Sequence, residues 1–319
     1  MPVSRNPHDG APTTRSATNS IEPAVAANGI FVDVTSPVRA ALAGVSLGDG
    51  LPVAVLGALN VGPGSFYAGS VVTRSDDLLR AAERMVREGA ALLDVGARST
   101  APYLSDAVSA SEEAERLARA IALLAGKLGV PISADTSRAE PARAALDAGA
   151  GIINDVRGLT GDPHLAPLVA RSGAGLIVMA SETDATPARP PVETVLEALR
   201  TGLGVAERAG IDAQCIVVDP GIGFFRRRGV AWHEWDCSVL AGLERLRALG
   251  RPLCVGASRK SFIGEIAGEP DPARRLPGSL AATTAAVLAG AHLIRAHDVA
   301  DTVQAVRVAE AVHRAREHP

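Results

Sequence analysis

Short apolar runs alternate with segments of helical spacing along most of the chain, and this alternation constrains the fold more than any other feature of the sequence. The runs are apolar almost throughout, which is typical of strands buried on both faces of a parallel sheet. They lie at residues 53–59, 91–95, 132–134, 151–153, 175–179, 215–218, 253–256 and 293–296. The pattern therefore predicts a series of parallel strands joined by helices.

The segments between the runs repeat their apolar residues every three or four positions, as amphipathic helices do. We predict helices at residues 75–88, from Ser111 onward, and at residues 140–149, 165–172, 192–209, 238–249, 279–290 and 299–315. Several of them end in a glycine that can adopt the left-handed helix cap. Eight strands and eight helices in strict order predict an α/β fold, a closed (β/α)8 TIM barrel with its functional site at the carboxyl ends of the strands.

An open doubly wound sheet is the structural alternative. It needs a glycine-rich phosphate loop after the first strand, but the segment after Asn60 has neither GxGxxG nor GxxxxGK spacing. We expect residues 1–28 to form a disordered leader, because they are rich in Pro, Ser, Thr and Asn, and residues 29–319 to form a single barrel domain. A short strand pair near residues 30–34 and Val45 is expected to form a hairpin that closes the barrel floor.

The charge balance and the cysteine count exclude several classes of partner. The chain has 32 Lys and Arg against 35 Asp and Glu, a net charge of −3, so it lacks the basic field that holds a nucleic acid. No apolar stretch reaches the roughly 18–20 residues that span a bilayer, so we expect no membrane contact. Three cysteines without CxxC spacing favour a reducing compartment, and we expect a cytoplasmic protein whose partners are small molecules.

Polar side chains stand at the end of most predicted strands. They are Asn60, Asp94, Asp135, Asn154-Asp155, Asp219, Ser258-Arg259-Lys260, Arg295 and His297-Asp298. Each alone can be a helix cap, which is the interpretation we favour for Asp155 and Asp298. In a barrel, however, they would converge at one mouth, where buried carboxylates need a ligand that donates hydrogen bonds. A flat heterocycle rich in N–H groups, such as an aminopyrimidinone, meets that need.

Within this set, Lys260 suits a ring carbonyl, whereas Arg295 and His297 with Asn60 suit an anion or its metal ion. Other chemistries lack their residues. The chain has no His-x-x-x-His zinc spacing and no GxSxG nucleophile elbow, and the cysteines have no obvious activating partner.

Seven ordered motifs connect the chain to a known family. They are Leu59-Asn60 with Ser65-Phe66, Leu93-Asp94 with Ser99-Thr100-x-Pro102, Asp135-Thr136, Ile153-Asn154-Asp155-Val156, Asp219-Pro-Gly-Ile-Gly-Phe224, Ser258-Arg259-Lys260-Ser261 and Ile294-Arg295-Ala-His297-Asp298. From Val53 to Val312 the chain resembles dihydropteroate synthase and its pterin-binding relatives. The last two motifs favour the synthase branch over the corrinoid-linked methyltransferases.

The resemblance implies a (β/α)8 barrel, usually a homodimer, that uses Mg²⁺ and joins an arylamine to a dihydropterin carrying a CH₂-diphosphate. It also implies roles for the matched positions. Asp94, Asp135, Asn154, Met179, Asp219 and Lys260 match the pterin-binding set. Asn60, Arg295 and His297 match the diphosphate end, with Asn60 as metal ligand, and Ser99, Thr100, Pro102, Phe224, Arg226 and Ser261 match the arylamine side. On the same basis catalysis falls to Asp94, Asp135, Lys260, Arg295 and His297.

The departures from the family pattern gather in the loops that face the second substrate. Where the family reads T-P-D-S-F, residues 61–66 have lost the Asp, and where it reads G-E-S-T-R-P, residues 97–102 have lost the Glu and the Arg. The usual Gly-Lys after Phe224 is Phe225-Arg226, followed by two more arginines, and the usual Met-His is Met179-Ala180. The pterin-binding set is intact.

Three interpretations follow from these departures. The chain is a synthase that uses p-aminobenzoate by default, or a ribofuranosylaminobenzene phosphate as in the methanopterin-associated branch, which its loops resemble. Arg98 and Arg226–Arg228 would suit that extra phosphate, although a solvated loop is the simpler interpretation of the arginine run. Alternatively it is a non-catalytic pterin-binding protein, or a pterin-dependent methyltransferase. Neither needs a diphosphate site, so Arg295 and His297 count against both.

Overall fold

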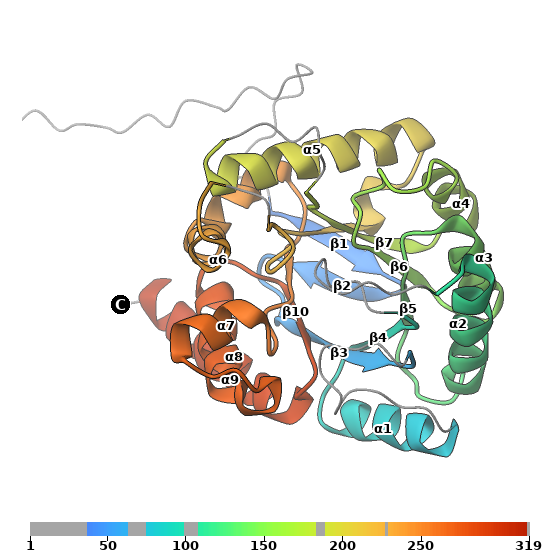
Figure 1. The fold of residues 1–319 in the computed structure, drawn as a ribbon, viewed down its shortest axis with the longest axis horizontal. Coiled ribbons are helices and arrows are strands. Elements are labelled where there is room, and N and C mark those ends of the chain that lie inside the picture. Colours follow the sequence, from blue (N-terminus) through green and yellow to red (C-terminus); the bar gives the residue numbers. More distant parts are fainter. Residues whose placement is uncertain (1–36, 63–74, 99–107, 183–188, 227–228, 318–319) are drawn as a thin grey trace, which may run out of the picture.

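The computed structural model describes residues 37–62, 75–98, 108–182, 189–226 and 229–317. They form a barrel of parallel strands surrounded by helices (Figure 1). The barrel strands are β3 (Ala54–Asn60), β4 (Leu92–Gly96), β5 (Ile132–Asp135), β6 (Ile152–Asp155), β7 (Gly175–Met179), β8 (Ile216–Asp219), β9 (Cys254–Val255) and β10 (Leu293–Ala296). They pair in the order β8-β7-β6-β5-β4-β3-β10-β9, and a parallel bridge between Val218 and Leu253 joins the two ends. The predicted (β/α)8 TIM barrel is confirmed.

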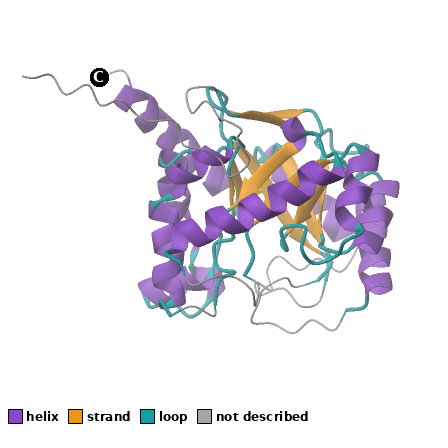
Figure 2. Cartoon of the chain, turned by 90° about the horizontal axis from the view of Figure 1, so that it is seen from above, coloured by secondary structure: helices purple, strands orange, loops and turns teal. Residues whose placement is uncertain are grey.

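The helices lie outside this barrel and mostly keep close to their expected bounds. They are α1 (Ser75–Arg87), α2 (Ala110–Leu124), α3 (Ala139–Asp147), α4 (Leu165–Ser172), α5 (Pro191–Ala209), α6 (Trp232–Ala241), α7 (Ser261–Ala267), α8 (Leu276–Leu288) and α9 (Val299–Glu317). Seen from above in Figure 2, they flank the strands on both sides. None of the helices in the described ranges combines the length and apolarity that a bilayer span requires.

Two helical predictions were wrong in detail. The helix expected at residues 238–249 is divided at Gly242 into α6 and a short 3₁₀ helix at Leu243–Leu249. A Cβ at position 242 would come within 2.6 Å of Val192 Cγ2, so close packing against α5 requires the glycine, which also weakens the helix there. Helix α7 was not expected, because seven residues are too few for an amphipathic repeat to stand out.

A hairpin closes one end of the barrel, and its second strand begins at Val45, as predicted. Its strands are β1 (Arg39–Leu42) and β2 (Val45–Gly48), joined by Ala43 and Gly44, which both have positive φ, as two-residue hairpin turns require. In Figure 1 they cross the centre of the barrel. The strand expected at residues 30–34 and the leader at residues 1–28 lie outside the described residues.

The barrel interior consists of an apolar layer beneath a polar one. Leu42 and Leu47 of the hairpin pack on the inward side chains of the strands. On four strands an inward apolar residue is followed two positions later by a polar one, namely Leu92 and Asp94, Ile152 and Asn154, Val217 and Asp219, and Leu293 and Arg295. Because strand side chains alternate between faces, each pair shares the inner face. Strand alternation therefore brings these polar groups to the open end of the barrel.

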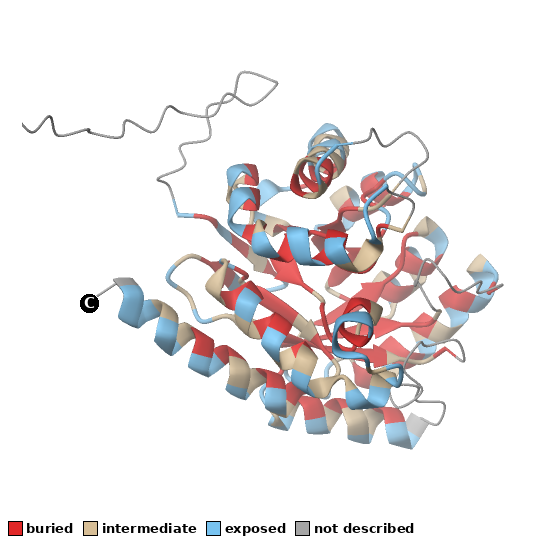
Figure 3. Cartoon of the chain, turned by 60° about the vertical axis from the view of Figure 1, so that its left-hand side comes forward, coloured by how far each residue is buried: buried red, intermediate tan, exposed pale blue. Residues whose placement is uncertain are grey.

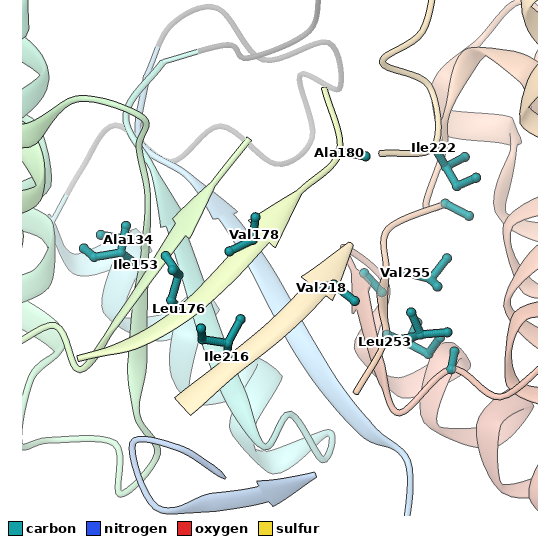
Figure 4. Close-up of a cluster of buried hydrophobic side chains, with 14 of the residues drawn as sticks. Ala134, Ile153, Leu176, Val178, Ala180, Ile216, Val218, Ile222, Leu253 and Val255 are labelled. Atoms are coloured by element: carbon teal, nitrogen blue, oxygen red, sulfur yellow. The ribbon is translucent and has the colours of Figure 1, made fainter. Parts of the chain in front are cut away.

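The outward side chains of the strands form a larger apolar cluster with the helices. Ile153, Leu176, Val178 and Val218 belong to it, as the close-up in Figure 4 shows. In Figure 3 the buried residues run along the strands and along the inward faces of the helices, whose outer faces are exposed. The strands are thus fixed from both sides, which makes them a rigid support for the polar layer.

Candidate active site

One arginine joins the polar ends of three strands. Arg295 on β10 donates from Nε to Asp94 Oδ2 at 2.7 Å and from Nη2 to Asp135 Oδ2 at 3.1 Å. The side-chain amide of Asn154 on β6 donates to the same Asp94 oxygen at 3.1 Å. We call Asp94, Asp135, Asn154 and Arg295 the polar cluster. Strand register allows these contacts, because β4, β5 and β6 are neighbours and β3 alone separates β10 from β4.

The polar cluster holds more acceptors than the chain satisfies. Asp94 Oδ1 and Asp135 Oδ1 are buried and have no hydrogen-bond partner within the described part of the chain. Burial and the charge of Asp94 raise the pKa of Asp135 to about 7, although Arg295 opposes the shift. Burial by itself lowers the pKa of Arg295, but the two carboxylates outweigh it and hold that pKa above its usual value. Unpaired buried carboxylate oxygens are costly, so the arrangement calls for a ligand with N–H donors.

Asp219 and Lys260 extend this surface on the side of β8. Asp219 Oδ1 accepts from the main-chain N–H of Gly221 at 2.7 Å, and burial raises the pKa of its carboxyl. Lys260 Nζ donates to the main-chain carbonyl of Ile222 at 2.8 Å and lies 4.2 Å from the centre of the Phe224 ring. Burial lowers the pKa of Lys260 to about 8, against the opposing charge of Asp219.

Met179 is the residue next to Asp219 across the sheet. The two are register partners on β7 and β8, and Met179 is buried at the open end of its strand. An unbranched thioether there gives the polar surface an adaptable apolar wall.

His297 follows β10 and contacts Ser258. Its Nδ1 lies 3.0 Å from Ser258 Oγ, and its main-chain N–H donates to the same oxygen at 3.3 Å. Burial, with the charges of Arg295, Arg259 and Lys260, lowers the pKa of His297 to about 3. The imidazole is therefore neutral at physiological pH.

Arg259 holds the loop that carries Ser258 and Lys260. Its backbone is left-handed, with φ of 57°, which is rare for a non-glycine residue. Its guanidinium donates to both oxygens of Asp298 at 2.8 and 2.6 Å and to two main-chain carbonyls of residues 272 and 273. The buried ion pair stabilises the strained turn, so Ser258 and Lys260 on either side of it keep their places.

Asn60 ends β3 beside the polar cluster. It is the register partner of Gly96, where an added Cβ would lie 3.4 Å from Asn60 Oδ1 and 3.6 Å from Asp135 Oδ2. These distances show that Asn60 and Asp135 both lie against this glycine. Among the described residues no group of three or more His, Cys, Asp or Glu side chains has the geometry of a metal site. Asn60 fits Mg²⁺ only as a single protein ligand to an ion held mainly by substrate phosphate and water, which is a common arrangement for magnesium.

The predicted arylamine residues lie partly outside the described ranges. Ser99, Thr100 and Pro102 cannot be placed, whereas Phe224, Arg226 and Ser261 stand together beside Lys260. Arg226 donates from Nη2 to Ser261 Oγ at 2.6 Å and from Nε to the carbonyl of Gly223 at 3.2 Å. Its guanidinium also stacks 4.2 Å from the centre of the Trp232 ring.

Like Arg226, Arg98 is bound by other residues of the protein. Arg98 Nε lies 3.1 Å from Glu113 Oε2, a carboxylate with no solvent exposure that also accepts from Arg138 Nη1 at 3.0 Å and from Thr136 Oγ1 at 2.6 Å. Arg98 is therefore the partner of a buried acid. Arg227 and Arg228 lie outside the described residues.

Sequence reasoning missed two buried acids of the mouth. Glu113 lies in the first turn of α2, where acidic residues are common because they interact favourably with the helix dipole, so its sequence position did not mark it as buried. Asp236, on α6, accepts from the main-chain N–H of Gly223 at 2.8 Å, and burial raises its pKa to about 6. The only signal for Asp236 was an acid between Trp235 and Cys237, which sequence alone cannot distinguish from a surface residue.

The helix-cap interpretation of two aspartates was also inaccurate. Asp155 accepts from the main-chain N–H groups of Arg157 and Leu159 at 2.9 and 2.5 Å, so it stabilises a turn well before α4 begins. Asp298 does precede α9, but its side chain is used by Arg259, and only its main-chain carbonyl accepts from Thr302.

Comparisons with known proteins agree with this geometry. The model of the family described as pterin binding enzyme matches residues 56–297. Dihydropteroate synthase of a Synechocystis strain is 36% identical over 82% of this chain and 90% of its own length. A Xanthomonas albilineans dihydropteroate synthase, solved with 4-aminobenzoic acid, is 38% identical with a TM-score of 0.76, covering 87% of this chain and 98% of that one. The Clostridium difficile enzyme, solved in the presence of pteroic acid, is 33% identical with a TM-score of 0.75, covering 83% and 98%.

Fold and site together define a (β/α)8-barrel enzyme with a buried, acid-rich cluster of side chains at the carboxyl ends of its strands. The chain belongs to the dihydropteroate synthase family of pterin-binding enzymes. It is accordingly a transferase.

Proposed function

We propose that the chain condenses (7,8-dihydropterin-6-yl)methyl diphosphate with p-aminobenzoate. The bond between the exocyclic carbon and the diphosphate oxygen breaks, a carbon–nitrogen bond to the arylamine forms, and the amine loses one proton. The observation that carries this proposal is the pair of buried carboxylate oxygens without a partner, Asp94 Oδ1 and Asp135 Oδ1, within the polar cluster. An aminopyrimidinone edge supplies the N–H groups that they lack.

The pterin is held by side chains that complement its edge. The carboxylates of Asp94 and Asp219 accept from ring and exocyclic N–H groups, and the amide of Asn154 adds a donor and an acceptor. Lys260 donates to the ring carbonyl, and Met179 packs on the ring face. When the diphosphate leaves, the exocyclic carbon becomes cationic, and the fixed carboxylates around the ring stabilise that charge.

The diphosphate end is assigned to Arg295, His297 and Asn60. Arg295 has donors beyond the two that bind carboxylates, and a guanidinium matches phosphate oxygens well. Asn60 would hold Mg²⁺, which when bound neutralises charge on the diphosphate oxygens. The neutral imidazole of His297 adds a hydrogen bond without another cation.

The engaged arginines favour p-aminobenzoate over a phosphorylated arylamine. Arg98 pairs with Glu113. Arg226 donates hydrogen bonds to Ser261 and Gly223 and stacks on the Trp232 ring. A phosphate would have to displace those contacts. The small carboxylate of p-aminobenzoate needs only one edge of Arg226 and the hydroxyl of Ser261, with Phe224 against the ring.

We also propose that the protein is a homodimer and cytoplasmic. Ile266 on α7 and Val308 and Val312 on α9 are large apolar side chains that are 58%, 64% and 43% exposed. Figure 1 places α7, α8 and α9 side by side on one flank of the barrel. Sedimentation of the pure protein should give twice the mass of the chain, and Ile266→Glu should halve it if this flank is the contact.

The assay is diphosphate release by purified protein with dihydropterin diphosphate, Mg²⁺ and each arylamine in turn. Turnover with p-aminobenzoate supports the proposal. Turnover only with the riboside phosphate would replace p-aminobenzoate by the larger arylamine. Tight pterin binding without turnover with either arylamine would instead favour a pterin-binding protein.

A further inference from the structure

The contact between Ser258 and His297 fixes more than the position of the imidazole. Ser258 Oγ lies 3.0 Å from His297 Nδ1 and accepts from the main-chain N–H of His297 at 3.3 Å. Ser258 is only 8% exposed, so water has little access to its hydroxyl. The left-handed backbone of the next residue, Arg259, holds the serine in this place.

Ser258 and His297 can be hydrogen-bonded to each other in only one way that gives each buried proton an acceptor. A serine hydroxyl has one proton and two acceptor lone pairs. One lone pair accepts from the main-chain N–H of residue 297, so the hydroxyl proton of Ser258 goes to His297 Nδ1. With the proton on Nδ1, the buried hydroxyl proton of Ser258 would have no acceptor among the contacts of the described residues, which is costly. In a neutral imidazole the ring proton is then on Nε2.

We propose that Ser258 is a positioning residue that fixes His297 as the Nε2–H tautomer and so makes it a hydrogen-bond donor to a diphosphate oxygen. The identity of the ligand rests on the proposed function, but the tautomer does not. With the proton on Nδ1, Nε2 would present a lone pair to the ligand and repel a phosphate oxygen. The hydroxyl of Ser258 thus decides whether His297 attracts or repels the leaving group.

A neutral donor suits the charges that face this histidine. Arg295, Arg259 and Lys260 all act on it and oppose a further positive charge. Carboxylates nearby are already paired, Asp298 with Arg259 and Asp94 with Arg295. His297 therefore contributes a directed hydrogen bond rather than a charge. It can donate that bond only while the proton is on Nε2.

The decisive experiment measures the tautomer directly in the full-length protein labelled with ¹⁵N. A spectrum that correlates ring nitrogens with ring protons separates protonated from unprotonated nitrogens, and His297→Asn identifies the resonances of His297 among the seven histidines. We expect an unprotonated Nδ1 and a protonated Nε2 in the wild type. In Ser258→Ala both nitrogens should move toward values of a tautomer mixture, and Ser258→Thr should restore the wild-type pattern.

Ser279→Ala is the matched control. Ser279 is also buried and its hydroxyl makes two hydrogen bonds, with the Arg259 N–H and the Arg275 carbonyl, both at 2.8 Å. Removing this hydroxyl should lower the unfolding free energy about as much as Ser258→Ala does, without changing the His297 tautomer. A change in both variants would mean that general loosening, rather than the Ser258 hydroxyl, sets the tautomer, and would overturn the proposal.

Binding of inorganic diphosphate supplies the functional half of the test. Ser258→Ala should weaken it about 10-fold, while the affinity for a pterin changes by less than about 2-fold, as expected for the loss of one hydrogen bond. A wild type with its proton on Nδ1, or a Ser258→Ala protein that keeps the Nε2–H tautomer, overturns the proposal. If the tautomer shifts as expected but no arylamine is turned over, the proposed function fails while the role of Ser258 stands.

Discussion

The two sides of the barrel mouth are built from different kinds of support. On the pterin side, Asp94, Asn154 and Arg295 project from strands that are packed on both faces and bind one another directly. On the arylamine side, Phe224 and Arg226 stand on a loop after β8, held by α6 and the start of α7. A strand-borne side chain cannot change direction without moving the sheet, whereas a loop residue can.

The electrostatics of the two sides differ in the same way. The pterin side has an excess of buried carboxylate, with two oxygens that need a ligand to be satisfied. The arylamine side matches its cations within the protein, Arg98 with Glu113 and Arg226 with Ser261 and Gly223. The first side thus has carboxylate oxygens that need a ligand, whereas the two arginines of the second side are already paired.

The largest effect is expected from Arg295→Ala. It leaves the carboxylates of Asp94 and Asp135 buried without their cation, which should cost about 3–5 kcal/mol of unfolding free energy. Turnover should fall about 1,000-fold, because in the proposed function the same guanidinium stabilises the developing charge on the diphosphate. Urea unfolding and diphosphate release measure the two effects.

Arg247→Ala is the comparison on the opposite end of the barrel. Arg247 pairs with Asp49 at 2.7 Å, but its side chain is 39% exposed, so its loss should cost about 1 kcal/mol or less and leave turnover intact. Equal losses in the two variants would contradict the view that the polar cluster is special.

The next largest effect is expected from Asp219→Asn. The change removes the charge of a buried acceptor while keeping its size, so the affinity for the pterin should fall by about 2–4 kcal/mol. Titration calorimetry with a pterin measures this. Asp212→Asn changes an exposed aspartate before β8 that accepts from the N–H of Gln214, and it should leave pterin affinity unchanged. Unchanged affinity in Asp219→Asn would refute the role given to that carboxylate.

A smaller effect is expected from pH. In the proposed function the pterin needs the ionised form of Asp135, whose pKa is about 7, and the protonated form of Lys260, whose pKa is about 8. The pH profile of kcat/KM should therefore be bell-shaped, rising up to about pH 7 and falling above about pH 8, with roughly 10-fold loss per pH unit beyond each limb. Asp135→Asn should abolish the acid limb and keep the alkaline one. A variant that keeps the acid limb would assign it to another group.

The raised pKa of Asp135 should also affect folding stability, which is expected to decrease with rising pH where activity increases. The pKa of Asp135 is higher in the folded protein than in the unfolded chain, so between about pH 4 and pH 7 the folded state binds more protons. Unfolding free energy should therefore decrease as the pH rises through this range and level off above it. The decrease should be shallower in Asp135→Asn, as urea titrations at a series of pH values would reveal.

The placement of most residues on the pterin side can be predicted from the sequence, whereas that of the arylamine side can be predicted only in part. Strand alternation alone predicts that Asp94, Asn154 and Asp219 share the inner face, because each follows an inward apolar residue by two positions. Nothing local indicates that Glu113 would reach Arg98 or that Ser258 would face His297, since these contacts depend on how loops pack after the barrel has closed. Short elements were missed for a related reason. Helix α7 is set by its neighbours, not by its own periodicity.

The smallest effect, and the sharpest for the comparison, is expected from Asp236→Asn. Asp236 lies on α6 and supports the loop of Phe224 and Arg226 by accepting from the Gly223 N–H at 2.8 Å. Its other oxygen is buried without a partner in the described ranges, and its charge acts on Lys260 and Arg226. An asparagine keeps the acceptor but removes the charge, so we expect the KM for p-aminobenzoate to rise about 3-fold with pterin affinity unchanged.

Asp236→Ala removes the acceptor as well and separates the two contributions. It leaves the Gly223 N–H without its partner, so the loop loosens and the KM for p-aminobenzoate should rise further, about 10-fold. Glu234→Gln, an exposed change on the same helix, should alter neither substrate. If Asp236→Ala weakened pterin binding as much as arylamine binding, the two sides of the mouth would not be independent. Their coupling would then run through Lys260, which lies against Phe224 and donates to the neighbouring carbonyl of Ile222.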